Sequence, residues 1–206
     1  MKKKILAACL VVCLLATAVI GTTLAYFTDK TEVVTNTFTS GNVDITLDEA
    51  PVDANGKETT GDRGNNGNTY KLYPGKEYDK DPTVHIVKDS EDCYVLVKVE
   101  NGLAGLEVAT GNGDTIAEQM TANGWKAVEG DVTNVYVYTA GGAAPVVVSD
   151  ETDLVVFENF TIAESATAGD LDAAKTASIT ITAYAIQAEG MSEKTAAELW
   201  TAGGWV

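Results

Sequence analysis

Short runs in which apolar and polar residues alternate constrain the fold of this 206-residue chain more than any other feature. In the clearest run, Val43, Ile45 and Leu47 alternate with polar neighbours. A period of two residues is typical of a strand with one buried face. Turn residues such as Pro74-Gly75 separate these runs, and no internal repeat is visible. Many short strands joined by such turns predict an all-β protein.

The strongest strand candidate is apolar on both of its faces. Cys93, Val95, Val97 and Val99 form one face, and Tyr94 and Leu96 contribute to the other. A strand of this kind is expected to lie centrally between two layers. We expect the remaining strands at residues 43–48, 83–87, 132–138, 146–148, 154–157 and 178–186, with a return to strand near Trp125 and Val128. The predicted fold class is a jelly-roll-like β-sandwich.

One or two short helices are expected as insertions between the strands. The first is predicted over residues 114–123, where Asp114 can cap the start and Gly124 can end the helix. The second is predicted over residues 193–200, capped by Ser192. Parallel α/β winding would need a helix after nearly every strand, and the pattern lacks them.

The N-terminus has the pattern of an export signal. Lys2 to Lys4 precede the apolar run 5–20, and the small residues Thr23 and Ala25 form a cleavage site before Tyr26. We therefore predict a signal peptide at residues 1–25 and a secreted protein. An uncleaved membrane anchor is the alternative, since the run approaches the roughly 18 apolar residues of a spanning helix.

Charge and cysteine content narrow the functional classes. The formal net charge is −16, which opposes binding to nucleic acid and anionic lipid. Cys93 is the only cysteine outside the predicted signal, so no disulfide within the mature chain is expected. A free cysteine at the head of a strand is most often a small buried residue. An odd exported thiol can also be a reactive site or an intermolecular partner.

The sequence contains few candidate catalytic residues, and we predict that the protein is not an enzyme. His85 is the only histidine, so a two-histidine zinc motif cannot be built. A Cys93–His85 dyad is a remote alternative to a structural histidine. Residues 53–58 and 112–114 begin like calcium loops but lack the later ligands. Solvated turns are the preferred interpretation, so no cofactor is predicted, and calcium is the weaker alternative. The long polar loop 51–68 is expected to be a mobile excursion on the surface.

Several segments together resemble a known family. The clearest are Ala25-Tyr26-Phe27-Thr28-Asp29 at the signal junction and NTFTSGNVDITL at residues 36–47. Weaker matches are at 72–76, 80–84, 94–99 and 181–187, whereas residues 102–167 match poorly. In these segments the chain resembles the TasA/camelysin family of exported bacterial proteins.

The resemblance implies export through a dedicated signal peptidase of the SipW type and a jelly-roll domain. For TasA-like members it also implies biofilm matrix fibres in which the mature N-terminal segment adds as a strand to a neighbouring subunit. Residues 26–37 would form this arm, with Tyr26, Phe27, Val33 and Val34 available for pockets. An ordinary first strand within its own domain is the alternative. The domain would then be residues 38–206.

The sequence therefore predicts a secreted structural protein of the extracellular matrix or cell surface. Its expected partners are other copies of itself or other matrix subunits, and no small-molecule substrate is identified. One alternative is a monomeric adhesin or accessory matrix protein. The other is a metallopeptidase, the activity that the camelysin name carries.

Overall fold

The computed structural model describes residues 42–109 and 115–205. The chain divides into two units, Met1–Ser40 and Gly41–Val206, and all that follows concerns the second. The predicted signal peptide, the arm and the boundary at residue 38 lie outside the described residues.

The described residues form three antiparallel sheets, which confirms the predicted all-β class. The first sheet contains, in spatial order, β1 (Ile45–Asp48), β3 (Thr83–Ile86) and β8 (Asp153–Val155). In the same order, the second contains β10 (Ile179–Gln187), β4 (Cys93–Asn101), β7 (Val135–Tyr138) and β6 (Trp125–Ala127). The third contains β2 (Glu77–Asp79), β9 (Asn159–Ile162) and β5 (Glu107–Val108). The jelly-roll connectivity stays a prediction.

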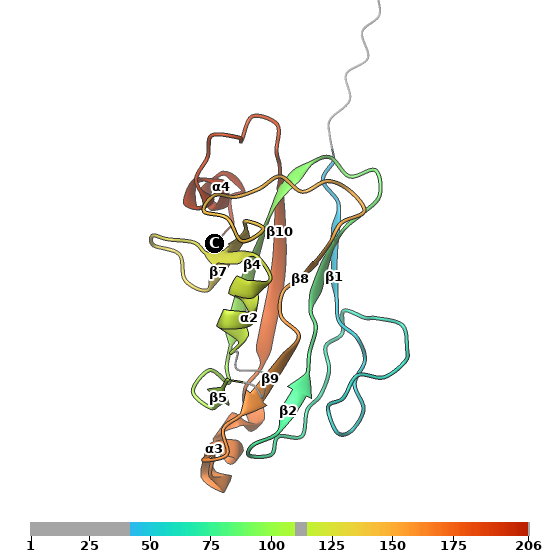
Figure 1. Cartoon of the computed structure of the whole chain (residues 1–206), viewed down its shortest axis with the longest axis vertical. Helices are drawn as coiled ribbons and strands as arrows, with labels where there is room; N and C mark the ends of the chain where they lie inside the picture. Colours follow the sequence, from blue (N-terminus) through green and yellow to red (C-terminus); the bar gives the residue numbers. More distant parts are fainter. Residues whose placement is uncertain (1–41, 110–114, 206) are drawn as a thin grey trace, which may run out of the picture. The chain divides into compact units, whose positions relative to one another are not determined.

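Strand β4 lies between two apolar layers, as its two-sided pattern predicted. Val95 and Val97 face the larger core cluster, which takes residues from all three sheets. Tyr94 and Leu96 face a smaller cluster that contains Leu199 of α4 (Ala196–Ala202). Figure 1 shows α4 on one side of β4 and β10, with β1 and β8 on the other. The second sheet is thus the middle layer of the domain.

The described part of the chain contains three short α-helices. α2 (Ile116–Ala122) and α3 (Ala168–Ala173) lie between strands, whereas α4 follows the last strand, β10, and so is not the insertion between strands that was predicted. A 3₁₀ turn, η1 (Ala174–Thr176), follows α3. A threonine precedes each α-helix, and its hydroxyl accepts a hydrogen bond from the N–H of the third helical residue. The acidic side chain of that third residue accepts a hydrogen bond from the N–H of the threonine. No helix in the described ranges is long and apolar enough to cross a membrane.

Both predicted helices form, but both predicted caps were wrong. Thr115 caps α2 in place of Asp114, and Thr195 caps α4 in place of Ser192. In both cases the reason is that threonine stands three residues before a glutamate, and the two side chains satisfy two backbone donors at once. Gly124 follows the end of α2 with a φ of +89°, as its predicted role requires.

Other predictions fail where strands are short. Residues 146–148 form no strand, and only Val148 pairs, through an isolated bridge to Cys93. Strands β2, β5 and β9 and helix α3 were missed. These strands have two to four residues, too few to establish a period.

Candidate functional site

The most distinctive functional feature is a pair of neighbouring strands with open edges. Among the strands of the described ranges, β10 pairs only with β4, and β1 pairs only with β3. The N–H of Ala188, just beyond β10, bonds toward β4, to Asp92. Because bonding directions alternate along a strand, the N–H and C=O groups of Ile179, Ile181 and Ala183 point to the free edge. No described strand satisfies them.

A groove of about 510 Å³ runs beside these two edges. Its walls are residues 45–49 of the β1 segment and 179–183 of β10. Ile45, Ile181 and Ala183 are half-buried and pack against the larger core cluster. An added strand would therefore find apolar side chains and unpaired backbone groups in the same place.

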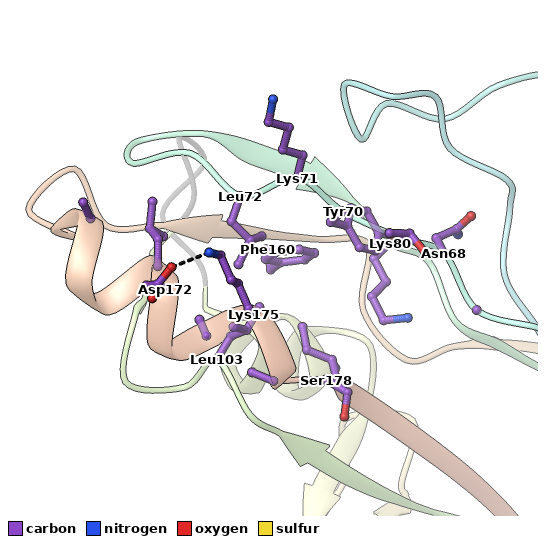
Figure 2. Close-up of a pocket in the computed structure, with 17 residues that line it drawn as sticks. Asn68, Tyr70, Lys71, Leu72, Lys80, Leu103, Phe160, Asp172, Lys175 and Ser178 are labelled. Carbon is purple, nitrogen blue, oxygen red and sulfur yellow. Dashed lines mark hydrogen bonds and ion pairs between the residues drawn. The ribbon is translucent and has the colours of Figure 1, made fainter.

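A second hollow of about 720 Å³ lies between the segment 67–72 and helix α3. Its volume is within the usual range of ligand pockets, roughly 300–1,000 Å³. Phe160, Leu72 and Leu103 give it an apolar lining, and Lys175 lies at its side in an ion pair with Asp172 (Figure 2). The side chain of Lys71 points away from the hollow.

The 67–72 wall is held by buried aromatic residues. The Tyr78 hydroxyl donates to the carbonyl of Lys71 at 2.8 Å and accepts from the N–H of Tyr73 at 2.7 Å. The ring of Tyr78 stacks on Phe160 with 5.1 Å between centroids, and Tyr70 meets both rings edge-on. This aromatic cluster fixes the shape of the cavity from the core side.

A buried ion pair marks the place where the two hollows meet. Gly67, Lys80 and Ile179 line both of them. Lys80 and Glu49 are each about 7 % exposed, and the Lys80 ammonium donates to the Glu49 carboxylate. The other Glu49 oxygen accepts from the Asn68 amide at 3.1 Å. Removing either charge would leave its partner buried and uncompensated.

The loop 51–68 lies on the surface, as expected, and Arg63 ties it to the first sheet. The Arg63 guanidinium contacts the carboxylates of Asp48 and Asp81 and donates to the hydroxyl of Thr83 at 3.0 Å. Glu49 and Gly64 also exchange backbone hydrogen bonds of 2.9 and 3.0 Å. This loop therefore covers the end of the β1 edge and leaves β10 as the longer open one.

His85 joins three strands and has a structural position. Its Nδ1 lies 2.6 Å from Asp153 on β8, and its buried Nε2 lies 3.1 Å from Asp48 on β1, without the alignment of a hydrogen bond. Burial of the imidazole disfavours its charge, but the carboxylates of Asp153 and Asp48 outweigh burial and raise the pKa of His85. Cys93 is not among these partners.

Cys93 is the small buried residue at the head of β4 that its position predicted. It is fully buried, and burial together with the charge of Asp92 raises the pKa of its thiol to about 11. A thiol of that pKa is protonated at neutral pH and is a poor nucleophile. The dyad of Cys93 with His85 therefore has no support in the geometry.

No group of three or more His, Cys, Asp or Glu residues in the described ranges is arranged to hold a metal ion. His85 lies near the carboxylates of Asp48 and Asp153, but Arg63 already pairs with Asp48. These residues do not fit a zinc site.

The site residues predicted from the sequence all belong to the N-terminal segment. Thr23, Ala25, Tyr26, Phe27, Val33 and Val34 lie outside the described residues. Sequence reasoning missed the two hollows, because they form where segments far apart in the sequence come together, 67–72 with α3 and 45–49 with 179–183. The one available signal was the alternation of isoleucine and threonine at residues 179–182, which is typical of a half-exposed strand.

Comparison with known proteins gives a match to a family model. The sequence model of the camelysin metallo-endopeptidase family matches residues 1–58, which include both segments, 25–29 and 36–47, on which the resemblance mainly rests. No curated protein and no solved structure gives a significant match. Over its first 58 residues, the chain is therefore similar to the camelysin family, the resemblance that those two segments predicted.

Proposed function

We propose that this chain is a secreted structural protein that assembles with copies of itself by strand addition. Residues 26–37 of one copy pair with the free edge of β10 in the next copy. The polymer belongs to the extracellular or biofilm matrix, and a dedicated signal peptidase releases the mature chain during export.

The observation that carries this proposal is the open edge of β10 beside an apolar-walled groove. An exposed edge offers a row of unpaired N–H and C=O groups that another chain can bind. In strand addition, these backbone bonds give affinity and side-chain pockets give specificity. Both elements occur together along residues 179–183.

The interface type also favours an extended assembly. The donor segment and the acceptor groove are different surfaces of one molecule, so each copy can give one strand and receive one. Such head-to-tail contacts produce rings when they close and filaments when they do not. The net charge of −16 opposes unspecific aggregation of the same chains.

The test is electron microscopy of purified residues 26–206 beside residues 38–206, at high concentration, with and without calcium. We expect regular filaments from the longer chain and dispersed particles from the shorter one. Both core clusters lie within residues 42–205, so the shorter chain retains the whole described core. Equal thermal unfolding of the two would verify that only assembly changed. Filaments from both chains would overturn strand addition by this arm.

Dispersed particles from both chains would favour a monomeric adhesin or accessory matrix protein. In that case, sedimentation as a monomer at every concentration should accompany binding to polysaccharide or to fibre partners. Capture of those partners would then replace assembly as the functional assay.

The printed description of the matched family favours a second candidate, a secreted metallo-endopeptidase. The test is cleavage of casein by pure mature protein, with and without a chelator, together with its metal content. Chelator-sensitive cleavage would establish the peptidase. Absence of casein cleavage by the metal-loaded chain would rule out the peptidase.

A further inference from the structure

We infer that the 720 Å³ cavity between residues 67–72 and α3 is a side-chain pocket for Phe27 of a second copy. This inference rests on the proposed strand addition and deepens it, because it assigns the register in which the arm binds. The groove beside β10 receives the backbone, and the cavity at its end receives the aromatic anchor.

The cavity and the groove adjoin each other. Both are lined by Gly67, Lys80 and Ile179, so an extended chain that leaves the groove near Ile179 reaches the mouth of the cavity. The cavity is lined by Phe160, Leu72 and further apolar side chains (Figure 2). Such a lining suits a large apolar side chain at the end of an added strand.

The arm has one face that fits this path. In a strand, alternate side chains share a face, so Phe27, Asp29 and Val33 would lie together. The opposite face would carry Tyr26 and Val34, together with charged residues between them. Both faces have an apolar residue at each end and a carboxylate between them, but Phe27, unlike Tyr26, has no hydroxyl that would need a partner inside an apolar cavity.

The spacing of this face matches the path. With Phe27 in the cavity, Asp29 reaches the junction, where Lys80 and Ile179 lie. In this register the arm runs parallel to β10. Val33 is four residues beyond Asp29, as Ala183 is four residues beyond Ile179, so Val33 lies at the level of Ala183. Four residues of extended chain span about 13 Å on either strand. Val33 would thus meet the half-buried apolar wall of the groove.

The charges around the cavity are balanced. Lys80 and Lys175 line it, and Glu49 and Asp172 pair with them. The apolar lining, rather than a charge, therefore carries the proposed contact with Phe27.

A mixing experiment tests the inference. One partner is the chain without its arm, residues 38–206. The other is residues 26–206 with Ala168→Trp, which fills the cavity from an exposed position on α3. The first chain has no arm to donate, and the second has no open cavity to receive one. Each should therefore sediment as a monomer when it is alone. Mixed, they should form one-to-one dimers, because the arm of the second enters the free cavity of the first.

Variants of the donor then assign the anchor. Adding Phe27→Ala to the donor should weaken the dimer roughly tenfold or more, as expected for an anchor side chain in a pocket. Tyr26→Ala is the matched control and should change the dissociation constant less than about threefold, because Tyr26 lies on the opposite face. Ala117→Trp, on the exposed face of α2 and outside both hollows, controls for the added tryptophan.

The outcomes separate this inference from the proposed function. If residues 38–206, which lack the arm, assemble as residues 26–206 do, the proposed function itself is overturned. If removal of the arm stops assembly but Ala168→Trp does not, or Phe27→Ala and Tyr26→Ala act equally, only the assignment of the cavity fails. Failure of the mixture to dimerise would show that the arm does not act between copies through this cavity, and would also overturn the inference.

Discussion

Strands β4 and β10 are both nine residues long and pair with each other over their full length, but their environments differ. Strand β4 has a partner on each side, and six of its nine residues are buried. None of the residues of β10 is fully buried, and one of its edges has no described partner. Within one sheet, β4 is thus a central, buried strand, whereas β10 has an edge that no described strand pairs.

The sequences of the two strands reflect this difference. Both faces of β4 carry large apolar residues, whereas β10 alternates Ile179 and Ile181 with Thr180 and Thr182. Its inward side chains become smaller at Ala183 and Ala185, and both lie against the larger core cluster. Small side chains beside an open edge leave space for a further chain. The comparison predicts that β4 controls folding and that β10 controls assembly.

The largest effect is expected in β4, from Leu96→Ala. Leu96 is fully buried between β4 and α4. Loss of its side chain should lower the free energy of unfolding by about 2–5 kcal/mol, measured by urea denaturation. Thr182→Ala, at an exposed position of β10, is the control and should change stability by less than about 0.5 kcal/mol. Equal losses would contradict the division between the two strands.

Proline at adjacent positions of β10 gives the next largest effect. The N–H of Thr182 points to β4 and that of Ala183 to the free edge, so Thr182→Pro alone breaks the existing ladder. Thr182→Pro should cost roughly 1–3 kcal/mol more than Ala183→Pro, because a β4 carbonyl loses its donor. Ala183→Pro should instead prevent filament formation, seen by electron microscopy. Filaments from the Ala183→Pro chain would place the acceptor edge elsewhere.

Helix α4 extends the comparison to the outer face of β10. Trp200 of α4 meets Tyr184 of β10 edge-on, with 5.0 Å between ring centroids. Removing the cap with Thr195→Ala should lower the unfolding free energy by about 1 kcal/mol. Thr167→Ala removes the same cap from α3, which buries none of its residues, and should cost less. A larger loss from Thr167→Ala would show that α3 supports the core more than its exposure indicates.

Elements with a long or two-sided pattern could be predicted from the sequence. The alternation in β4 runs without a break from Cys93 to Val99, which is enough to identify both of its faces. Helix α3 was missed although Thr167 and Asp170 carry the same capping signature as α2 and α4, because no apolar stripe follows it. The strands β2, β5 and β9 form through pairing with distant segments, and their own residues specify them weakly.

The candidate site was less predictable for the same reason. An open edge is a property of the sheet order, and a groove needs two segments such as 45–49 and 179–183 side by side. Neither can be read from local periodicity. The arm residues, in contrast, were predicted from a motif at the signal junction. Whether this arm binds in the groove is tested by removing the arm and by the mixing experiment.

The smallest effect is expected in the first sheet, where His85 of β3 contacts Asp48 of β1 and Asp153 of β8. Its pKa is raised in the folded chain, so protonation stabilises the fold. This contribution is complete below the unfolded pKa of about 6.5 and is lost as the pH rises through the folded value. His85→Gln should remove this slope, with a stability difference of less than about 1 kcal/mol, since the group is partly exposed.

Urea denaturation at several pH values from about 5 to 9 measures the His85 effect, because this range brackets the ordinary pKa of histidine. The pKa of Asp48 shifts in the opposite direction: burial raises it, but Arg63 and His85 lower it further. Its contribution is therefore present above the unfolded value of 3.8 and is lost at lower pH. Together, the two groups should make the β1–β3–β8 sheet most stable in mildly acidic solution. Filament formation through β10 should show no matching step near the His85 pKa, and a shared step would mean that the two edges are coupled.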